Sequence, residues 1–410
     1  MSYLPCMERV LRTGADNIAS SFACRIAAVA VTFALTAPLA VESQSAPPGG
    51  TPTPTVTRAD LAASYMRLDR VLSAKTVTDT VRAGVSRAFD RSTLAFFGGR
   101  FLAAVTTIDS LTVAISGAPL VVAPPPSARL VNGKAPSIAR ERLLARLAKV
   151  DSSGVLLQAL VSARARASLL VDVPSVDRSA EFLTDPARLA ADVEREVSAL
   201  ERGKNPYAKL AGDHWRTVRG ANGAAVPFRI VASKAVASAK TAVPLLIVLH
   251  GAGGDENMFV DAYGAGITPR LAQERGWLLV SPATTAFGAS PANFDLLLAQ
   301  LKSEYAIDSS RVYLLGHSMG AGAAARLQSQ RPTTVAGTVC LAGGAAVKTD
   351  VPPRMLFVGA ALDPIIPAAT VKAAAMATPG SVYRELANVG HTLMVSEGVR
   401  MGMEWLGERR

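Results

Sequence analysis

The spacing of apolar residues along the chain changes near residue 205. Before that point apolar side chains recur every three or four residues, as in segments 58–73, 137–150 and 185–203. Such spacing places the apolar side chains on one face of a helix. We therefore predict a separate, mainly helical region of unknown role over residues 58–205.

After residue 205 short apolar runs alternate with segments of helical spacing. Ahead of the first run, Asn222-Gly223 predicts a hairpin turn between two strands. Alternating buried strands and helices predict an α/β domain over residues 206–410, with a mostly parallel central sheet covered by helices on both faces. Strands are expected at residues 243–250, 276–282, 311–316, 334–344, 353–360 and 381–387, and helices at residues 268–276, 293–305, 319–330, 367–377 and 393–408.

The beginning of the chain has a different character. Arginines precede an apolar run at residues 26–40, which is shorter than the ~20 residues that span a bilayer. Small residues follow, so residues 1–45 are expected to be a secretory signal peptide that exports the protein to the periplasm or beyond, or else an uncleaved anchor. Residues 46–57 are rich in Pro, Gly and Thr and predict an extended linker.

Composition narrows the classes of partner. The net charge is +11, but Lys and Arg are interspersed with acidic residues and only 5% of residues are aromatic. This favours solvated helix faces over a nucleic-acid surface, and a membrane is expected as a partner only if the leader stays attached. Only Cys340 lies outside the leader, so no intramolecular disulfide is expected. The oligomeric state is left open.

The first candidate catalytic motif is Gly-His-Ser-Met-Gly at residues 316–320, between the end of a predicted strand and the start of a predicted helix. A sharp turn there would expose the hydroxyl of Ser318, and Gly316 and Gly320 would avoid side-chain clashes. The same pattern also arises by chance in glycine-rich turns. A serine nucleophile additionally needs a base and an acid.

An acid and a histidine follow in the required order. Asp363 comes just after one predicted strand, and His391 comes just after the next. Of the four histidines, His317 adjoins the serine, His250 lies in an early loop and the fourth precedes the hairpin. We therefore predict Ser318, His391 and Asp363 as nucleophile, base and orienting acid.

The stretch His-Gly-Ala-Gly-Gly at residues 250–254 ends an early strand. Acyl transfer builds negative charge on a carbonyl oxygen, and each aimed backbone N–H stabilises it by ~3 kcal/mol. We predict Ala252 and Met319 as these donors, with His250 and Gly251 supporting the turn. The alternative for this stretch is an ordinary strand-ending loop.

No metal or organic cofactor is expected. Residues 320–325 imitate a dinucleotide-binding fingerprint, but the following strand ends without the acid that such a site requires. One cysteine outside the leader and four histidines in all leave little for a structural zinc site.

With these motifs, residues from about 210 to 410 resemble the α/β-hydrolase superfamily. Within it they are similar to small secreted esterases of the polyhydroxybutyrate-depolymerase, feruloyl-esterase and dienelactone-hydrolase-like groups. The resemblance rests on residues 249–257, 316–320, 359–367 and 390–392. It implies an α/β-hydrolase fold, the triad and oxyanion roles given above, and a small-molecule or short polymeric ester as substrate. Unlike secreted polymer depolymerases, the chain lacks paired cysteines and an aromatic-rich binding module, which argues against a solid polymer.

Three classes of function are consistent with the sequence. The first is a serine carboxylic ester hydrolase that works through an acyl-enzyme, and an acyltransferase would carry the same residues. The second is a serine peptidase of the prolyl-oligopeptidase kind, although the helical region has no strand repeats to build a propeller. The third is a partner-binding protein that uses the hydrolase fold as a scaffold without catalysis.

Overall fold

A computed structural model describes residue 56 and residues 58–121, 131–151, 154–172 and 185–408. The predicted leader at residues 1–45 lies outside the described residues, and so does the predicted linker at residues 46–57 except for residue 56. None of the described helices combines the length and apolar character needed to cross a membrane.

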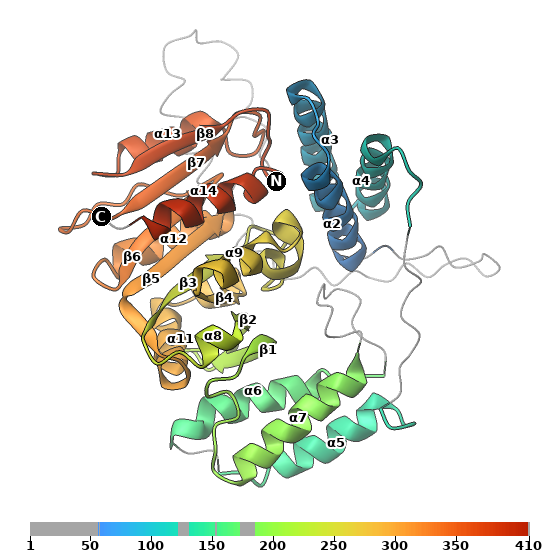
Figure 1. The fold of residues 1–410 in the computed structure, drawn as a ribbon, viewed down its shortest axis with the longest axis vertical. Helices are drawn as coiled ribbons and strands as arrows, with labels where there is room; N and C mark the ends of the chain where they lie inside the picture. Colours follow the sequence, from blue (N-terminus) through green and yellow to red (C-terminus); the bar gives the residue numbers. More distant parts are fainter. Residues whose placement is uncertain (1–55, 57, 122–130, 152–153, 173–184, 409–410) are drawn as a thin grey trace, which may run out of the picture. The chain divides into compact units, whose positions relative to one another are not determined.

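In the described part of the chain, eight strands form one sheet in the order β1-β2-β4-β3-β5-β6-β7-β8 (Figure 1). The pairs β1–β2 and β2–β4 are antiparallel, and all the other neighbouring strands are parallel. The strands are β1 (Gly212–Arg219), β2 (Ala225–Ala232), β3 (Val243–Leu249), β4 (Leu278–Pro282), β5 (Ile307–His317), β6 (Val335–Leu341), β7 (Met355–Ala360) and β8 (Val382–Leu386). The predicted mostly parallel sheet of an α/β-hydrolase fold is thereby confirmed.

The strands at the centre of the sheet are buried on both faces. Along β3, Leu246 and Val248 belong to one apolar core, whereas Leu245, Ile247 and Leu249 belong to another. This alternation explains why the strand reads as an unbroken apolar run in the sequence.

Helices cover each face of the sheet. On the first core lie α9 (Ile267–Arg275), α14 (Val395–Gly407), a short π-helix (Met258–Ala262) and a 3₁₀ helix (Tyr263–Ala265). On the opposite face lie α8 (Lys234–Ala237), α10 (Thr284–Gly288), α11 (Pro291–Glu304), α12 (Met319–Gln330) and α13 (Ala368–Met376).

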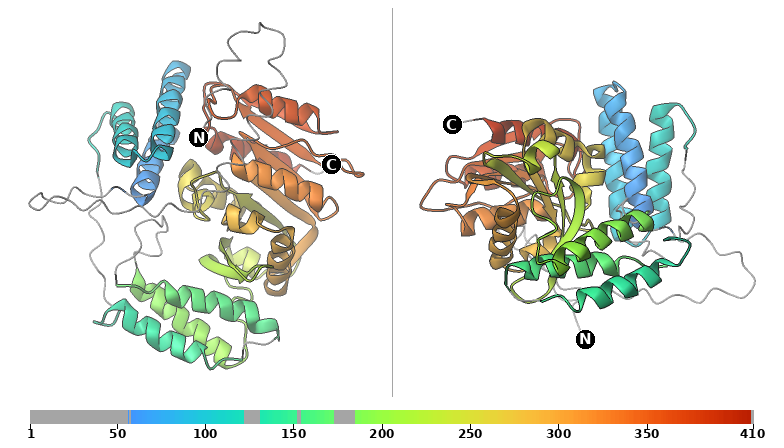
Figure 2. Two further views of the ribbon diagram at one scale, coloured as in Figure 1. Left: turned by 180° about the vertical axis from the view of Figure 1, so that it is seen from behind. Right: turned by 60° about the horizontal axis from the view of Figure 1, so that its bottom comes forward.

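In the described part of the helical region before the sheet, the helices form two groups. The first group is α2 (Arg58–Ala74), α3 (Asp79–Phe97) and α4 (Phe101–Ser116), which lie side by side in Figures 1 and 2. Tyr65, Phe89 and Ile108 from these helices belong to the same buried cluster as Leu246 and Val248 of the sheet. These three helices therefore share a core with the α/β fold.

The second group is α5 (Pro136–Leu147), α6 (Leu157–Ser168) and α7 (Pro186–Glu201), preceded at α6 by a turn at Gly154–Leu156. These helices lie side by side in both views of Figure 2 and enclose a cluster of their own. A hydrogen bond joins this group to β1, the edge strand of the sheet. Arg166 Nη1 of α6 donates to the carbonyl oxygen of Trp215 on β1 at 2.8 Å. The described residues from Val56 onward thus belong to one compact unit.

A buried ion pair fixes β1 against α11. Two guanidinium nitrogens of Arg216 donate to the two carboxylate oxygens of Glu304 at 2.6 and 2.7 Å. The Arg216 side chain is 1% exposed and that of Glu304 is fully buried. The guanidinium also stacks over the ring of Tyr207 at 3.8 Å.

Candidate active site

Ser318 lies at the sharp turn between β5 and α12. Its backbone has φ 55° and ψ −118°, a conformation that residues other than glycine rarely adopt. The turn is held in place because the Ser318 N–H donates to the carbonyl oxygen of Leu341 on β6 at 2.9 Å. The neighbouring strand therefore holds Ser318 in a strained backbone conformation. Such strain is common at active sites.

The two glycines that flank the serine are required by backbone contacts. A Cβ atom added at Gly316 would lie 2.2 Å from the carbonyl oxygen of Gly320. A Cβ atom added at Gly320 would lie 1.9 Å from the carbonyl oxygen of Leu249 at the end of β3. The start of α12 thus packs directly on the neighbouring strand, which only glycine allows.

The structure brings Ser318, His391 and Asp363 into one hydrogen-bonded array. His391 Nε2 lies 2.9 Å from Ser318 Oγ, and His391 Nδ1 lies 2.7 Å from Asp363 Oδ2. Because a carboxylate only accepts, Nδ1 carries the proton and Nε2 accepts from the serine hydroxyl. The other carboxylate oxygen of Asp363 accepts from the N–H groups of Ile365 and Ile366 at 2.8 and 2.9 Å. The array can therefore move a proton from the serine to the histidine.

His317 supports the backbone of His391. The carbonyl oxygen of His391 only accepts, so His317 Nε2 donates to it, at 2.9 Å. Nδ1 of the same ring then accepts from the hydroxyl of Tyr263, also at 2.9 Å. Burial lowers the pKa of His317 well below its ordinary value, so the ring stays neutral. His317 is thus placed to hold a loop rather than to exchange protons with a substrate.

His250 orders the loop at residues 250–254. Its Nε2 accepts from the N–H of Thr284 at 2.9 Å, and its Nδ1 donates to the carbonyl oxygen of Gly251 at 2.8 Å. The loop lies against the serine, since a Cβ atom added at Gly251 would be 3.2 Å from Ser318 Cβ. Ala252 follows in this loop, and Met319 is the first residue of α12. Both predicted oxyanion donors therefore lie beside Ser318.

Asp90 on α3 is part of the site, although no sequence motif points to it. Its Oδ2 accepts from the backbone N–H of His391 at 3.0 Å, and the residue is 1% exposed. Burial raises the pKa of Asp90 to about 6. A Cβ atom added at Gly390 would lie 1.9 Å from the same Oδ2, so this contact accounts for the glycine before His391. The one signal in the sequence is an acidic residue beside Phe89, on the apolar face of a helix.

A cavity of about 160 Å³ opens beside Ser318 and His391. The loop at residues 251–255 forms one wall, and side chains from α2 and α3 form another. The helix α10, in the loop region after β4, does not line it. The lining is mostly apolar, as is usual for small-molecule sites.

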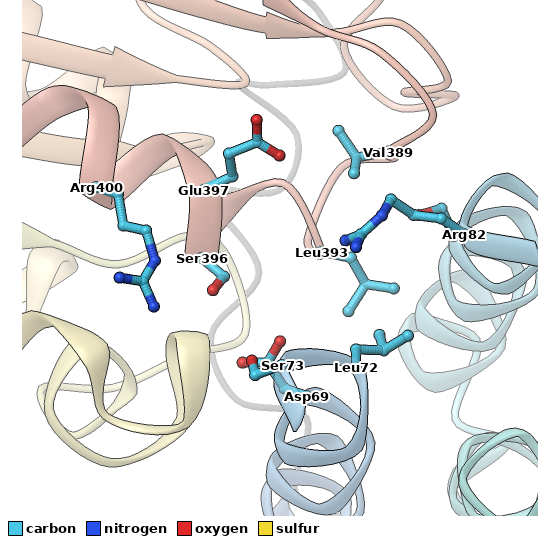
Figure 3. A pocket seen from close by; sticks show the side chains of 10 residues that line it. Asp69, Leu72, Ser73, Arg82, Val389, Leu393, Ser396, Glu397 and Arg400 are labelled. Atoms are coloured by element: carbon cyan, nitrogen blue, oxygen red, sulfur yellow. The ribbon is translucent and has the colours of Figure 1, made fainter. Parts of the chain in front are cut away.

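A second cavity of about 270 Å³ lies away from the serine. Figure 3 shows charged side chains around it, among them Asp69 of α2, Arg82 of α3, and Glu397 and Arg400 of α14. Burial raises the pKa of Asp69 to about 6. Among the described residues, no group of three or more His, Cys, Asp or Glu side chains is arranged to hold a metal ion.

Comparison with known proteins agrees with the fold. The family model described as serine aminopeptidase, S33 (Hydrolase_4) matches residues 251–391. No protein of curated function shows significant similarity to the sequence. The family match and the order of the strands bear out the resemblance to α/β-hydrolases.

Solved structures with similar folds include three hydrolases. A thermostable esterase is 24% identical with a TM-score of 0.37, over 47% of this chain and 62% of its own. This chain therefore spans less than two thirds of that esterase. A fluorophosphonate-binding serine hydrolase of Staphylococcus aureus is 10% identical with a TM-score of 0.41, over 48% and 99% of the two chains. The feruloyl esterase module of Clostridium thermocellum is 10% identical with a TM-score of 0.41, over 48% and 88%.

Proposed function

We propose that this protein is a serine hydrolase that cleaves carboxylic esters of small molecules or short polymers. The observation that carries the proposal is the continuous array from Ser318 through His391 to Asp363, with distances of 2.9 and 2.7 Å. A neutral serine hydroxyl is a weak nucleophile, and this arrangement supplies the base that activates it.

The first half of the reaction forms an acyl-enzyme. Ser318 Oγ attacks the ester carbonyl carbon while His391 Nε2 takes the hydroxyl proton, and Asp363 stabilises the resulting imidazolium. The N–H groups of Ala252 and Met319 receive the developing oxyanion, which the N-terminus of α12 also favours. The tetrahedral intermediate then collapses. The bond to the alcohol oxygen breaks, and His391 returns the proton to the leaving alcohol.

The second half regenerates the enzyme. A water molecule gives a proton to His391 Nε2 and attacks the acyl carbon. The second tetrahedral intermediate expels Ser318 Oγ, which recovers its proton from His391. The products are a carboxylic acid and an alcohol, and the chemistry needs no metal or organic cofactor.

The matched family is described as aminopeptidases, so peptide cleavage is the second candidate. The cavity favours esters, because its walls are mainly apolar and an amino terminus entering it would need acidic partners. Asp255 is the one acidic residue in the described lining, so an aminopeptidase would have to use it to hold the amino terminus.

The test is hydrolysis of p-nitrophenyl acetate and butyrate by the full chain, with Ser318→Ala as control. We expect wild-type activity to fall by at least ~10³-fold in the variant. A fluorophosphonate probe should label the wild type and leave Ser318→Ala unlabelled. Labelling without ester hydrolysis, together with cleavage of an aminoacyl p-nitroanilide, would establish the peptidase instead. An unlabelled wild type would contradict catalysis by Ser318.

A further inference from the structure

The cavity beside Ser318 has a wall that comes from outside the α/β fold. Leu61 and Tyr65 of α2 line it, together with Phe89, Phe96 and Phe97 of α3. We infer that α2 and α3 form the specificity wall of the active site and select esters that carry one compact apolar group, about as large as a single aromatic ring. The inference rests on the proposed function and assigns a task to residues 58–97.

Two phenylalanine rings of the wall lie close to the loop that carries the proposed oxyanion donor. A Cβ atom added at Gly253 would lie 2.9 Å from Cε1 of Phe97 and 3.6 Å from Cε1 of Phe96. These two rings therefore rest on the loop that contains Ala252, one of the proposed oxyanion donors. A substrate with its carbonyl group between that loop and Ser318 places one of its two substituents against these rings.

The wall is anchored rather than loosely attached. The ring of Tyr65 lies 5.3 Å from that of Phe89 and 6.2 Å from that of Tyr263, whose hydroxyl donates to His317. On the same helix as Phe89, Asp90 accepts from the backbone of His391. Aromatic contacts and a buried hydrogen bond thus fix the position of the wall relative to Ser318 and His391.

The size and chemistry of the cavity define the group that fits. A closed cavity of ~150 Å³ lined by Leu, Ile and Phe is known to take up benzene, and this one, which is open to solvent on one side, has about 160 Å³. Its lining includes Leu61, Phe96 and Ile365. A negatively charged substituent would lose its hydration there, since the described lining holds no Lys or Arg. One ring, or an aliphatic chain of about six carbons, matches this space.

The wall also limits the length of the group. Phe96 is 8% exposed, whereas its neighbour Phe97 is 43% exposed and marks the solvent side of the wall. Alkyl chains longer than the cavity must extend past Phe97 into water and gain little from the added methylene groups. The chain-length profile should therefore rise and then level off or fall.

Two ester series test the inference on the full chain. The first varies the acyl group of p-nitrophenyl esters through acetate, butyrate, hexanoate, benzoate and decanoate. The second varies the alcohol of acetate esters through methyl, butyl, benzyl and decyl. In one of the series we expect kcat/KM to rise about fourfold for each methylene group that enters the cavity, and to stop rising beyond about six carbons. A flat profile in both series would overturn the inference.

Two substitutions in the wall should move that profile in opposite directions. Phe96→Ala enlarges the cavity and should raise the ratio of decanoate to hexanoate hydrolysis, or of decyl to butyl ester hydrolysis, at least fivefold. Ala62 of α2 also lines the cavity. Ala62→Leu should therefore fill it and lower the ratio of hexanoate and benzoate to acetate hydrolysis at least tenfold. The matched control is Leu94→Ala, an exposed position on α3 outside the lining, which should keep the wild-type profile.

The outcomes separate the inference from the proposed function. Ester hydrolysis with the same profile in wild type, Phe96→Ala and Ala62→Leu would overturn the wall and leave the hydrolase intact. No hydrolysis and no fluorophosphonate labelling of the wild type would overturn both. Circular dichroism of each variant identifies any loss of activity that comes from unfolding.

Discussion

The carboxylate of Asp90 on α3 accepts a hydrogen bond from the backbone N–H of His391, with 3.0 Å between Asp90 Oδ2 and the nitrogen. The bond joins the helical region to the loop that carries the proposed base. It acts on the backbone of His391, while Asp363 and Ser318 engage the ring. Asp90 therefore fixes where the imidazole lies, which makes it a positioning residue.

Replacing Asp90 by Ala should reduce kcat by about 10- to 100-fold, because a buried hydrogen bond to a charged group contributes about 1.5–3 kcal/mol. KM should change little, since Asp90 is not part of the cavity lining. Asp90→Asn should recover most of the loss, because an amide oxygen still accepts the N–H. Steady-state kinetics with p-nitrophenyl butyrate gives both parameters. An Ala variant with wild-type kcat would rule out the positioning role.

Asp363→Asn should keep the fold and lose most of the activity. The amide oxygen can still accept from Ile365 and Ile366, but an NH₂ group would then face His391 Nδ1 and favour the wrong tautomer. We expect kcat to fall by about 10²- to 10⁴-fold with unchanged circular dichroism. Asp295→Asn, at an exposed carboxylate paired with Arg331, is the matched control and should keep full activity. Retained activity in Asp363→Asn would mean that another group orients the histidine.

Glu304→Ala should destabilise the protein strongly, because it leaves Arg216 charged and buried without its partner. Breaking such a pair costs about 3–5 kcal/mol. In Asp295→Ala the lost pair is exposed, so the expected cost is about 0–1 kcal/mol. Urea titration followed by circular dichroism measures both changes in the free energy of unfolding. Equal costs in the two variants would contradict the role assigned to the buried pair.

Asp69→Asn should stabilise the protein more at pH 8 than at pH 4.5. Burial raises the pKa of Asp69 from 3.8 to about 6, so the folded state holds this proton more tightly than the unfolded state does. The resulting stabilisation is complete below pH 3.8 and is lost as the pH rises through about 6. At pH 8 the charged carboxylate costs roughly 2–3 kcal/mol, which the amide avoids.

Urea midpoints of the wild type and the Asp69→Asn variant at the two pH values measure this difference. Asp60→Asn, at an exposed position on the same helix, is the control. A stabilisation of Asp69→Asn that is the same at both pH values would contradict the assignment.

The α/β fold could be predicted because its signals are local. Several buried strands contain a continuous apolar run, such as residues 243–249, and the turn at Ser318 needs glycines within two positions on either side. The order of Ser318, Asp363 and His391 along the chain follows from the ends of successive strands. These features depend on residues that are close together in the sequence, so a sequence pattern can predict them.

The contribution of the helical region could not be predicted in the same way. Asp90 meets His391, and Tyr65 meets Tyr263, only after the chain has folded back across the sheet. An acidic residue or a tyrosine on a helix face has many uses, and spacing alone does not select one. The sequence assigned no role to residues 58–205, whereas the structure places α2 and α3 against the serine. That Ser318, His391 and Asp363 act as a catalytic triad stays a prediction until the variants are measured.

The hydrogen bond between Asp90 and His391 also determines when, during synthesis of the chain, the active site can form. The two residues are 301 positions apart, so at ~5–20 residues per second the ribosome completes α3 about 15 to 60 s before it reaches the histidine. During that interval the buried cluster that Phe89 shares with the sheet and α14 is still incomplete. The proposed catalytic array is therefore incomplete until the end of the chain has been synthesised. Activity should arise in one step, after the last strand and α14 have emerged.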